Sequence, residues 1–378
     1  MNKYVYALTV AASVLMLPGC SNEDGMGLEG GNDLPVYVAG DSEVEILLGS
    51  KTESSVTVDK RAALEGNSDI EDLGVFCLAR EKQDINEGAY DINWFDEEEN
   101  WSGCLMQNVK AVKTGNNVAW ANPSKHYYYP ISQFYRYDFF GYYPYVEGGN
   151  ISMTDNRVRV TYALDGTTDV IWGRATSDEP HAYSAAYFRQ PGNEGKYPLL
   201  DLKHVLVRLK FQVKPGARVE GGDEVASAME DYAVAKVQVV NVPATGILTV
   251  ADFSRMDEID ETNCFTGGYE LTDYTLRKAD GTPMDTTMVG MDMDVETPLG
   301  ESVMVIPARE YVIRVHLVNV ETGDVFITEH PLKLTNSSLF QQGYTYTVTI
   351  TAHEPKEIQL QANLNGWIDA DDSPSVDL

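Results

Sequence analysis

Basic residues are scarce in this sequence. The 378 residues include 28 Lys and Arg against 58 Asp and Glu, which gives a formal net charge of −30 at pH 7. A nucleic-acid partner requires a basic face to meet phosphate groups, so we expect no nucleic-acid partner. The acidic balance is typical of an exposed protein whose own charge keeps it in solution.

Long hydrophobic runs are also lacking. The one early apolar stretch, Val5–Leu17, follows Lys3 and is too short to span a bilayer. It leads into Leu17-Pro18-Gly19-Cys20, followed by the polar, acidic Ser21–Gly25. This order predicts a lipoprotein signal peptide over residues 1–19, with Cys20 as the lipidated residue that holds the chain at the outer membrane. The alternative is a plain signal peptide with a coincidental cysteine.

Cysteines and metal-binding patterns are few beyond that point. Cys77, Cys104 and Cys264 remain, none of them in a CxxC pair. In an exported protein a Cys77–Cys104 disulfide is an open alternative, although buried thiols in strands are the interpretation we favour. The histidines form no HExxH or HxH pattern, so no zinc site is expected. Residues 292–296 alternate carboxylates but lack the glycine and the distal glutamate of a calcium loop.

Catalytic signatures are absent from the sequence as well. It contains no GxSxG elbow, no P-loop and no GxGxxG fingerprint. We therefore expect neither an enzyme nor a cofactor.

What the sequence does contain is a long series of short strand patterns. Alternating apolar residues recur between clusters of Gly, Pro, Asn and Asp, and one short helix is expected near Phe253–Ile259. This pattern predicts an all-β fold of antiparallel β-sandwiches. The strands are expected at 73–79, 109–112, 117–120, 127–129, 137–143, 158–162, 170–172, 202–213, 234–242, 303–306, 311–320, 325–334, 344–350 and 358–364.

The chain divides into segments by composition. After the signal, residues 20–61 comprise a polar tether and a first strand in which Val44, Ile46 and Leu48 share one face. A turn-rich break near 190–199 separates a predicted sandwich over 62–195 from a second over 196–378. Each block is large enough for its own hydrophobic core.

Aromatic residues gather in residues 126–145. Rings in this block could form a stacking platform for sugars. We favour the alternative that alternate rings fill a sandwich core, because they stand in strand-like runs.

Several segments, taken in order, resemble the fimbrillin family, the pilins of type V pili, and particularly its minor-fimbrium-like branch. They are the lipobox at Cys20, the leader ending at Arg61, Leu73-Gly74-Val75-Phe76, Phe139-Phe140-Gly141-Tyr142-Tyr143-Pro144, Asp169-Val170-Ile171-Trp172-Gly173, the histidine-marked Leu202–Phe211, Val305-Ile306-Pro307-Ala308, and Gly343–Val348 before Trp367. The resemblance implies two transthyretin-like antiparallel β-sandwich domains in tandem.

The resemblance also implies a maturation route. A trypsin-like protease would cut between Arg61 and Ala62, with Lys51 and Lys60 as alternative sites. The strand of Val44, Ile46 and Leu48 would then leave, and a strand from another pilin subunit would fill its groove. The candidate donor is the C-terminal segment, in which apolar residues alternate with polar ones: Ile358, Leu360, Ala362 and Leu364.

The leading hypothesis is thus a structural subunit of a cell-surface fimbrium that supports adhesion. The alternative is a glycan-binding surface lipoprotein or tip adhesin that keeps its lipid anchor. A host glycan or protein ligand is a further candidate partner.

Overall fold

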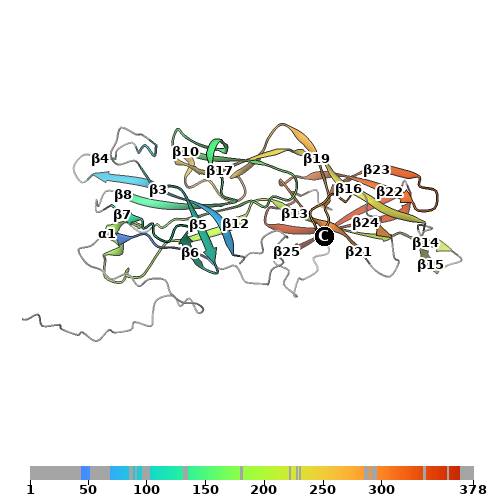
Figure 1. Cartoon of the computed structure of the whole chain (residues 1–378), viewed down its shortest axis with the longest axis horizontal. Coiled ribbons are helices and arrows are strands. Elements are labelled where there is room, and N and C mark those ends of the chain that lie inside the picture. The colour runs from blue at the N-terminus through green and yellow to red at the C-terminus, as the bar shows by residue number, and fades with distance from the viewer. Residues whose placement is uncertain are drawn as a thin grey trace, which may run out of the picture. The chain divides into compact units, whose positions relative to one another are not determined.

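The fold is built almost wholly from strands (Figure 1), which confirms the all-β prediction. The computed structural model describes residues 44–51, 69–84, 88–89, 92–95, 103–130, 135–178, 182–220, 223–226, 229, 231–284, 289–290, 296–334, 338–355 and 357–366. These residues all belong to one compact unit, Val36–Leu378, whereas the other unit, Met1–Pro35, lies outside them. Within the described ranges, no helix has the length and apolar character needed to cross a membrane.

The first large sheet closes on itself. Its order is β4-β3-β5-β6-β2-β12-β11-β8, and β3 also pairs with β8. The ladder therefore runs in a circuit from β3 through β5, β6, β2, β12, β11 and β8 back to β3. The strands are β2 (Leu48–Ser50), β3 (Ile70–Asp84), β4 (Gly88–Ala89), β5 (Cys104–Thr114), β6 (Asn117–Trp120), β8 (Tyr135–Tyr143), β11 (Ile171–Ala175) and β12 (Leu199–His204).

A smaller sheet, of order β18-β17-β10-β9, packs against this circuit. Trp172 of β11 donates its indole N–H to the carbonyl of Val250 in β17 at 2.9 Å, and Tyr162 of β10 donates to Pro144 O at 2.9 Å. Because β3 is covered on both faces, it can carry the continuous apolar run Leu73–Ala79, in which every residue is buried. A strand buried on one face only would instead alternate apolar and polar residues. The strands are β9 (Ile151–Thr154), β10 (Arg157–Ala163), β17 (Thr245–Asp252) and β18 (Phe265–Gly267).

Two further sheets face each other as a sandwich. Their orders are β21-β13-β24-β25 and β19-β16-β22-β23, and the ring of Phe340 joins them, lying 4.9 Å from Tyr311 of β22 and 4.8 Å from Tyr346 of β24. The strands are β13 (Val207–Pro215), β21 (Thr297–Val305), β24 (Tyr344–Glu354), β25 (Glu357–Gly366), β16 (Tyr232–Pro243), β19 (Leu271–Thr275), β22 (Glu310–Asn319) and β23 (Val325–Lys333), with β20 (Val289–Gly290) beside β16 and a separate hairpin of β14 (Ala217–Glu220) and β15 (Asp223–Ala226).

Ladder pairing crosses the expected division near residue 195. β11 pairs with β12, and β10 pairs with β17, so strands from both expected blocks share sheets. The division into 62–195 and 196–378 stays a proposal about folding units, and it does not coincide with a break in the hydrogen-bonded sheets.

Local expectations were wrong in two places. The expected helix at Phe253–Ile259 is a single 3-10 turn, η2 (Phe253–Arg255), and the described α-helix is α1 (Ala185–Phe188), with Ser184 as its N-cap. The expected strand 202–213 is two strands, because the chain leaves the closed circuit at His204 and enters the sandwich at Val207. One further 3-10 turn, η1 (Gly148–Asn150), precedes β9.

Candidate functional site: the leader strand and its seat

Three apolar side chains of the segment 44–51, called the leader segment from here on, are fully enclosed. Val44, Ile46 and Leu48 are 1%, 0% and 1% exposed, whereas Glu45 and Leu47 between them are half-buried. The predicted common face is therefore confirmed as a buried one. It is held by two short strands, β1 (Val44–Glu45) and β2, rather than by one continuous strand.

The leader segment occupies the interior of the closed circuit's ladder. β2 pairs antiparallel with β6, with Leu48 opposite Val118, and parallel with β12, with Gly49 opposite Leu199. β1 pairs antiparallel with β7 (Tyr128–Tyr129), with Val44 opposite Tyr129. Since β2 stands between β6 and β12, it completes the circuit, and its departure would leave two facing strand edges unpaired.

Backbone hydrogen bonds fix the leader on both sides. Ile46 N donates to Tyr127 O at 2.8 Å, and Ser50 N donates to Asn116 O at 2.9 Å. On the opposite side Gly49 N donates to Pro198 O and Lys51 N donates to Leu200 O, each at 2.9 Å. All four bonds join residues far apart in the sequence. The groove between β6 and β12 that holds the leader, called its seat from here on, therefore forms only in the folded chain.

Close packing at Gly49 shows how narrow the seat is. A Cβ at this position would lie 2.6 Å from the Tyr197 ring, 2.8 Å from the Leu199 side chain and 3.1 Å from the Asn116 carbonyl oxygen. Glycine is therefore needed for the close approach of three segments, and not for its backbone conformation.

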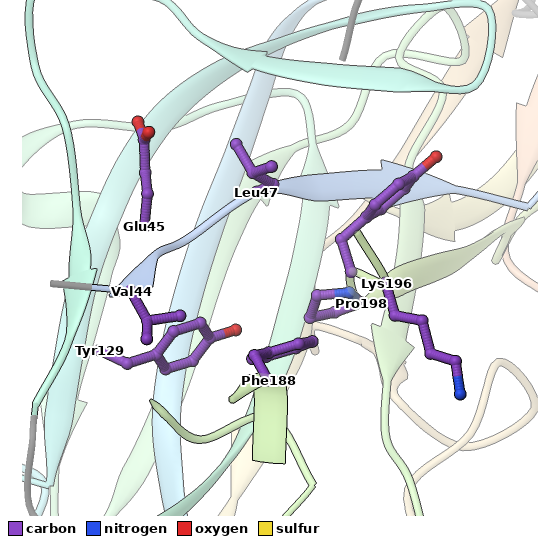
Figure 2. Close-up of a pocket in the computed structure, with 8 residues that line it drawn as sticks. Val44, Glu45, Leu47, Tyr129, Phe188, Lys196 and Pro198 are labelled. Carbon is purple, nitrogen blue, oxygen red and sulfur yellow. The ribbon is translucent and has the colours of Figure 1, made fainter. Parts of the chain in front are cut away.

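An aromatic cluster lies beneath the start of the leader. Figure 2 shows Val44 directly above Tyr129, with Phe188 and Pro198 to their right. The rings of Tyr129 and Phe188 are 5.3 Å apart, and Phe139 meets Tyr129 edge to face at 6.3 Å. The space among them is about 10 Å³, scarcely enough for one water molecule. The cluster thus forms a nearly filled floor for the leader.

The hydroxyl of Tyr129 is the unusual group in that floor. It is buried without a hydrogen-bond partner, and burial raises the pKa of Tyr129 well above its ordinary value. An unpartnered buried hydroxyl costs about 1–3 kcal/mol, so Tyr129 lowers the stability of this cluster.

Two charged contacts flank the leader. The Glu45 carboxylate lies 2.5 Å from His126 Nδ1, and Lys51 Nζ lies 3.5 Å from Asp201. Both pairs are partly exposed, so each contributes little to the stability of the folded protein.

A buried pair holds the neighbouring strand β12 in place. His204 Nδ1 lies 3.0 Å from Asp169 Oδ2, and both side chains are nearly inaccessible. In the adjoining ladder Ile171 stands opposite His204 and Trp172 opposite Lys203. Residues 169–173 and 202–211 are two separate motifs of the sequence. The structure pairs these two segments beside the leader, because β12 is the neighbour of β2.

The candidate donor strand lies in its own chain's sheet. β25 is the edge strand beside β24, with Ile358 opposite Ala352, Leu360 opposite Ile350 and Leu364 opposite Tyr346. Ile358 is buried, and Leu360 and Leu364 are partly buried against the core. The alternation expected from the sequence is thus present, in an edge position.

Other predicted features are placed as follows. Cys20, Lys60, Arg61 and Ala62 lie outside the described residues, as do 292–295 of the weak calcium pattern at 292–296. Cys77, Cys104 and Cys264 form no disulfide, and burial raises the pKa of Cys104 to about 12. Among the described residues no group of three metal-ligating side chains occurs.

The aromatic block of residues 126–145 mostly fills the core. Tyr129, Tyr137, Phe139, Phe140 and Tyr142 are buried, and only Tyr128 of the described block is a large exposed ring, at 40%. The core interpretation favoured from the sequence is confirmed for these residues.

A charged cluster that the sequence did not signal lies on the outer side of β8. Arg80 of β3 binds the buried Asp138 at 2.9 Å and also pairs with Asp257, while Arg174 donates to Met256 O. Burial raises the pKa of Asp138, and Arg80 opposes that shift. The cluster fastens the segment after β17 to the closed circuit, so its role is structural.

Comparison with known proteins gives a family match over most of the chain. The fimbrillin-like family model matches residues 61–367. No match is found among curated proteins.

The solved structures to which this chain is similar share little of its sequence. A candidate cell adhesion protein from Bacteroides uniformis is 16% identical, with 86% of this chain and 98% of that chain covered and a TM-score of 0.47. The tip fimbrial protein Mfa3 from Porphyromonas gingivalis is 10% identical, with 86% and 100% covered and a TM-score of 0.38. The fimbrial anchor protein Mfa2 from the same organism is 11% identical, with 86% and 97% covered and a TM-score of 0.28. On the strength of the family match, the chain belongs to the fimbrillin-like family.

Proposed function

We propose that this protein is a structural subunit of a cell-surface fimbrium that supports adhesion, exported as a lipoprotein precursor and assembled by strand exchange. One observation carries the proposal. The leader segment supplies β2, an interior strand of a closed ladder, yet it precedes every other described strand, and Val44, Ile46 and Leu48 contact the core together. Such a strand can leave as one piece.

The burial free energy that is lost when the leader leaves is large enough to favour its replacement by another strand. Burying three aliphatic side chains stabilises by about 1.5–3 kcal/mol each, or about 5–9 kcal/mol together. Once the strand has gone, β6 and β12 present facing unpaired edges, and an open edge of this kind pairs readily with another chain. A strand from a second subunit that supplied backbone bonds and alternate apolar side chains would restore the loss by β-augmentation.

Maturation by a trypsin-like protease fits the position of the basic residues. The leader ends in the described part at Lys51, and Lys60 and Arg61 follow in the sequence before Ala62. The family match begins at residue 61, next to this proposed cleavage site. Cleavage between Arg61 and Ala62 would also separate the folded part from a lipid on Cys20 and from the outer membrane.

The donor in this proposal is the C-terminal segment of another copy. β25 is an edge strand paired on one side only, with Ile358, Leu360 and Leu364 on alternate positions. An edge strand is released without breaking the middle of a sheet.

The competing proposal is a glycan-binding lipoprotein or tip adhesin that keeps its anchor and uses the aromatic block. Sugar stacking requires exposed rings, and Tyr129, Tyr137 and Phe139 are instead committed to the core beneath the leader. We therefore retain the fimbrial subunit as the better-supported function.

Limited trypsin digestion of the purified precursor tests the proposal. The precursor should be monomeric, trypsin should cut first between Lys51 and Arg61, and only the cut protein should form ladders on gels run without boiling. First cleavage in the middle of the chain, or ladders from the uncut precursor, would contradict it.

A further inference from the structure

A cavity of about 440 Å³ lies beside the closed circuit, between β12 and the segment that follows η2. One side is a shared face of β11 and β12, where Trp172 stands opposite Lys203 and Arg174 opposite Asp201. Residues 260–261 line the other side. The volume falls within the range of about 300–1,000 Å³ that is typical of small-ligand sites.

Charges of both signs line this cavity in equal number. Three bases and three acids contribute: Lys51, Arg174, Lys203, Asp201, Asp260 and Glu261. Lys203 Nζ lies 3.0 Å from Glu261, and Lys51 Nζ lies 3.5 Å from Asp201. A strongly charged ligand would therefore meet no net opposite charge, and an apolar ligand would remove water from six charged groups. The lining is complementary to a neutral molecule that both donates and accepts hydrogen bonds.

Two tyrosine rings supply the apolar part of the lining. Tyr183 and Tyr197 are each half-buried, so part of each side chain stays accessible. Tyr183 has a φ of 52°, which is uncommon for a bulky residue and carries backbone strain. Its ring stacks on Phe188 at 6.4 Å, and its hydroxyl donates to Thr176 O at 3.3 Å. Strained residues held in place by their surroundings concentrate at ligand sites.

We propose that this cavity binds a neutral sugar unit of a glycan. The hydroxyl groups of the sugar would donate to the carboxylates of Asp201 and Glu261 and accept from Lys203, and hydrogen bonds to charged groups of this kind are strong ones. The C–H face of the sugar ring would lie against the tyrosine rings. No other class of neutral ligand matches both the polar and the aromatic part of the lining as closely.

The site is distinct from the aromatic block considered above. Among the described residues that line the cavity, none belongs to residues 126–145. The inference adds a ligand to the adhesion role of the proposed function, and it does not rest on strand exchange, because the cavity is present with the leader in place. Of the lining residues only Lys51 belongs to the leader, so a chain cut after Arg61 keeps both tyrosines and all three carboxylates.

Saturation-transfer difference NMR on the purified precursor tests the site. The probes are methyl β-galactoside, methyl N-acetyl-β-glucosaminide and the acidic sugar N-acetylneuraminic acid. At least one neutral probe should receive saturation at its ring C–H protons and should bind more tightly than the acidic probe. Asp201→Asn should weaken binding of that neutral probe by roughly tenfold to a hundredfold, the scale of one hydrogen bond to a charged group.

Two further variants separate the cavity from other surfaces. Thr176→Trp should abolish binding, because the indole would fill the space that Thr176 now lines. Glu296→Gln is the matched control and should bind as the wild type does, because Glu296 pairs with Lys214 at 3.1 Å and does not line the cavity. Circular dichroism melting checks that each variant is folded, and Glu261→Gln replaces Thr176→Trp if the indole prevents folding.

The inference would be overturned by the absence of transfer to both neutral probes, by tighter binding of the acidic probe, or by equal binding of the Asp201→Asn and Glu296→Gln variants. None of these results bears on the proposed strand exchange, which is read from ladder formation by the trypsin-cut protein. Failure of the matured wild type to form ladders would refute that exchange and leave the sugar site standing.

Discussion

Replacing Ile46 with Ala should weaken the hold of the folded protein on its leader. Ile46 is fully buried, and its amide donates to Tyr127 O at 2.8 Å, a bond that the substitution preserves. Truncation of a buried isoleucine to alanine costs about 2–5 kcal/mol. At about 1.4 kcal/mol per factor of ten, the cut leader should dissociate roughly 30-fold to several thousand-fold more readily than in the wild type.

The assay is gel filtration of the trypsin-cut precursor, with the retained leader peptide quantified by mass spectrometry over time. Leu47→Ala is the matched control. Leu47 is also aliphatic and is adjacent to Ile46, but its side chain is half-buried and lies outside the enclosed face. Equal leader loss from the two variants would refute the argument that the enclosed face holds the leader.

Three other predictions concern the anchor, the pH dependence and the C-terminal strand. Cys20→Ala should abolish incorporation of radiolabelled fatty acid and leave the protein in the periplasm; label retained by the variant would contradict the lipoprotein assignment. Burial alone would raise the pKa of Asp252, but hydrogen bonds from Ser254 and Arg157 outweigh it and hold that pKa below its usual value. Its stabilisation is therefore present above the unfolded pKa of about 3.9 and is lost as the pH falls through the lower folded value, so Asp252→Asn should lower the melting temperature at pH 7 and have less effect near pH 2. Deletion of residues 356–378 removes the edge strand β25 and should leave a folded subunit, seen by circular dichroism, that cannot extend a polymer; a folded truncation that still forms ladders would count against donation by this segment.

The leader illustrates what sequence alone can and cannot predict. The alternation of Val44, Ile46 and Leu48 was sufficient to predict a shared buried face, because a strand's side chains alternate with a period of two. Its partners were not predictable, since Tyr127, Asn116 and Pro198 are distant in sequence and carry no pairing signal. Consequently neither the parallel pairing with β12 nor the closed circuit followed from the pattern.

Short elements and buried charges show a second limit. α1 spans only Ala185–Phe188, too short for helical periodicity, and its one readable signal is the N-cap Ser184. Asp138 is buried in an apolar, aromatic strand because Arg80 reaches it from a neighbouring strand, a contact that a single strand's pattern does not show. Val205 and Leu206 continue an apolar run although the chain changes sheets there, so the run reads as one strand.

N-terminal sequencing of the protein recovered from cell-surface fimbrial material tests the central claim most directly. Strand exchange after removal of the leader predicts a sequence that starts at Ala62, with Val44, Ile46 and Leu48 absent from the polymer. A blocked N-terminus at Cys20 in polymerised material would contradict it, because the leader would then still fill its own seat.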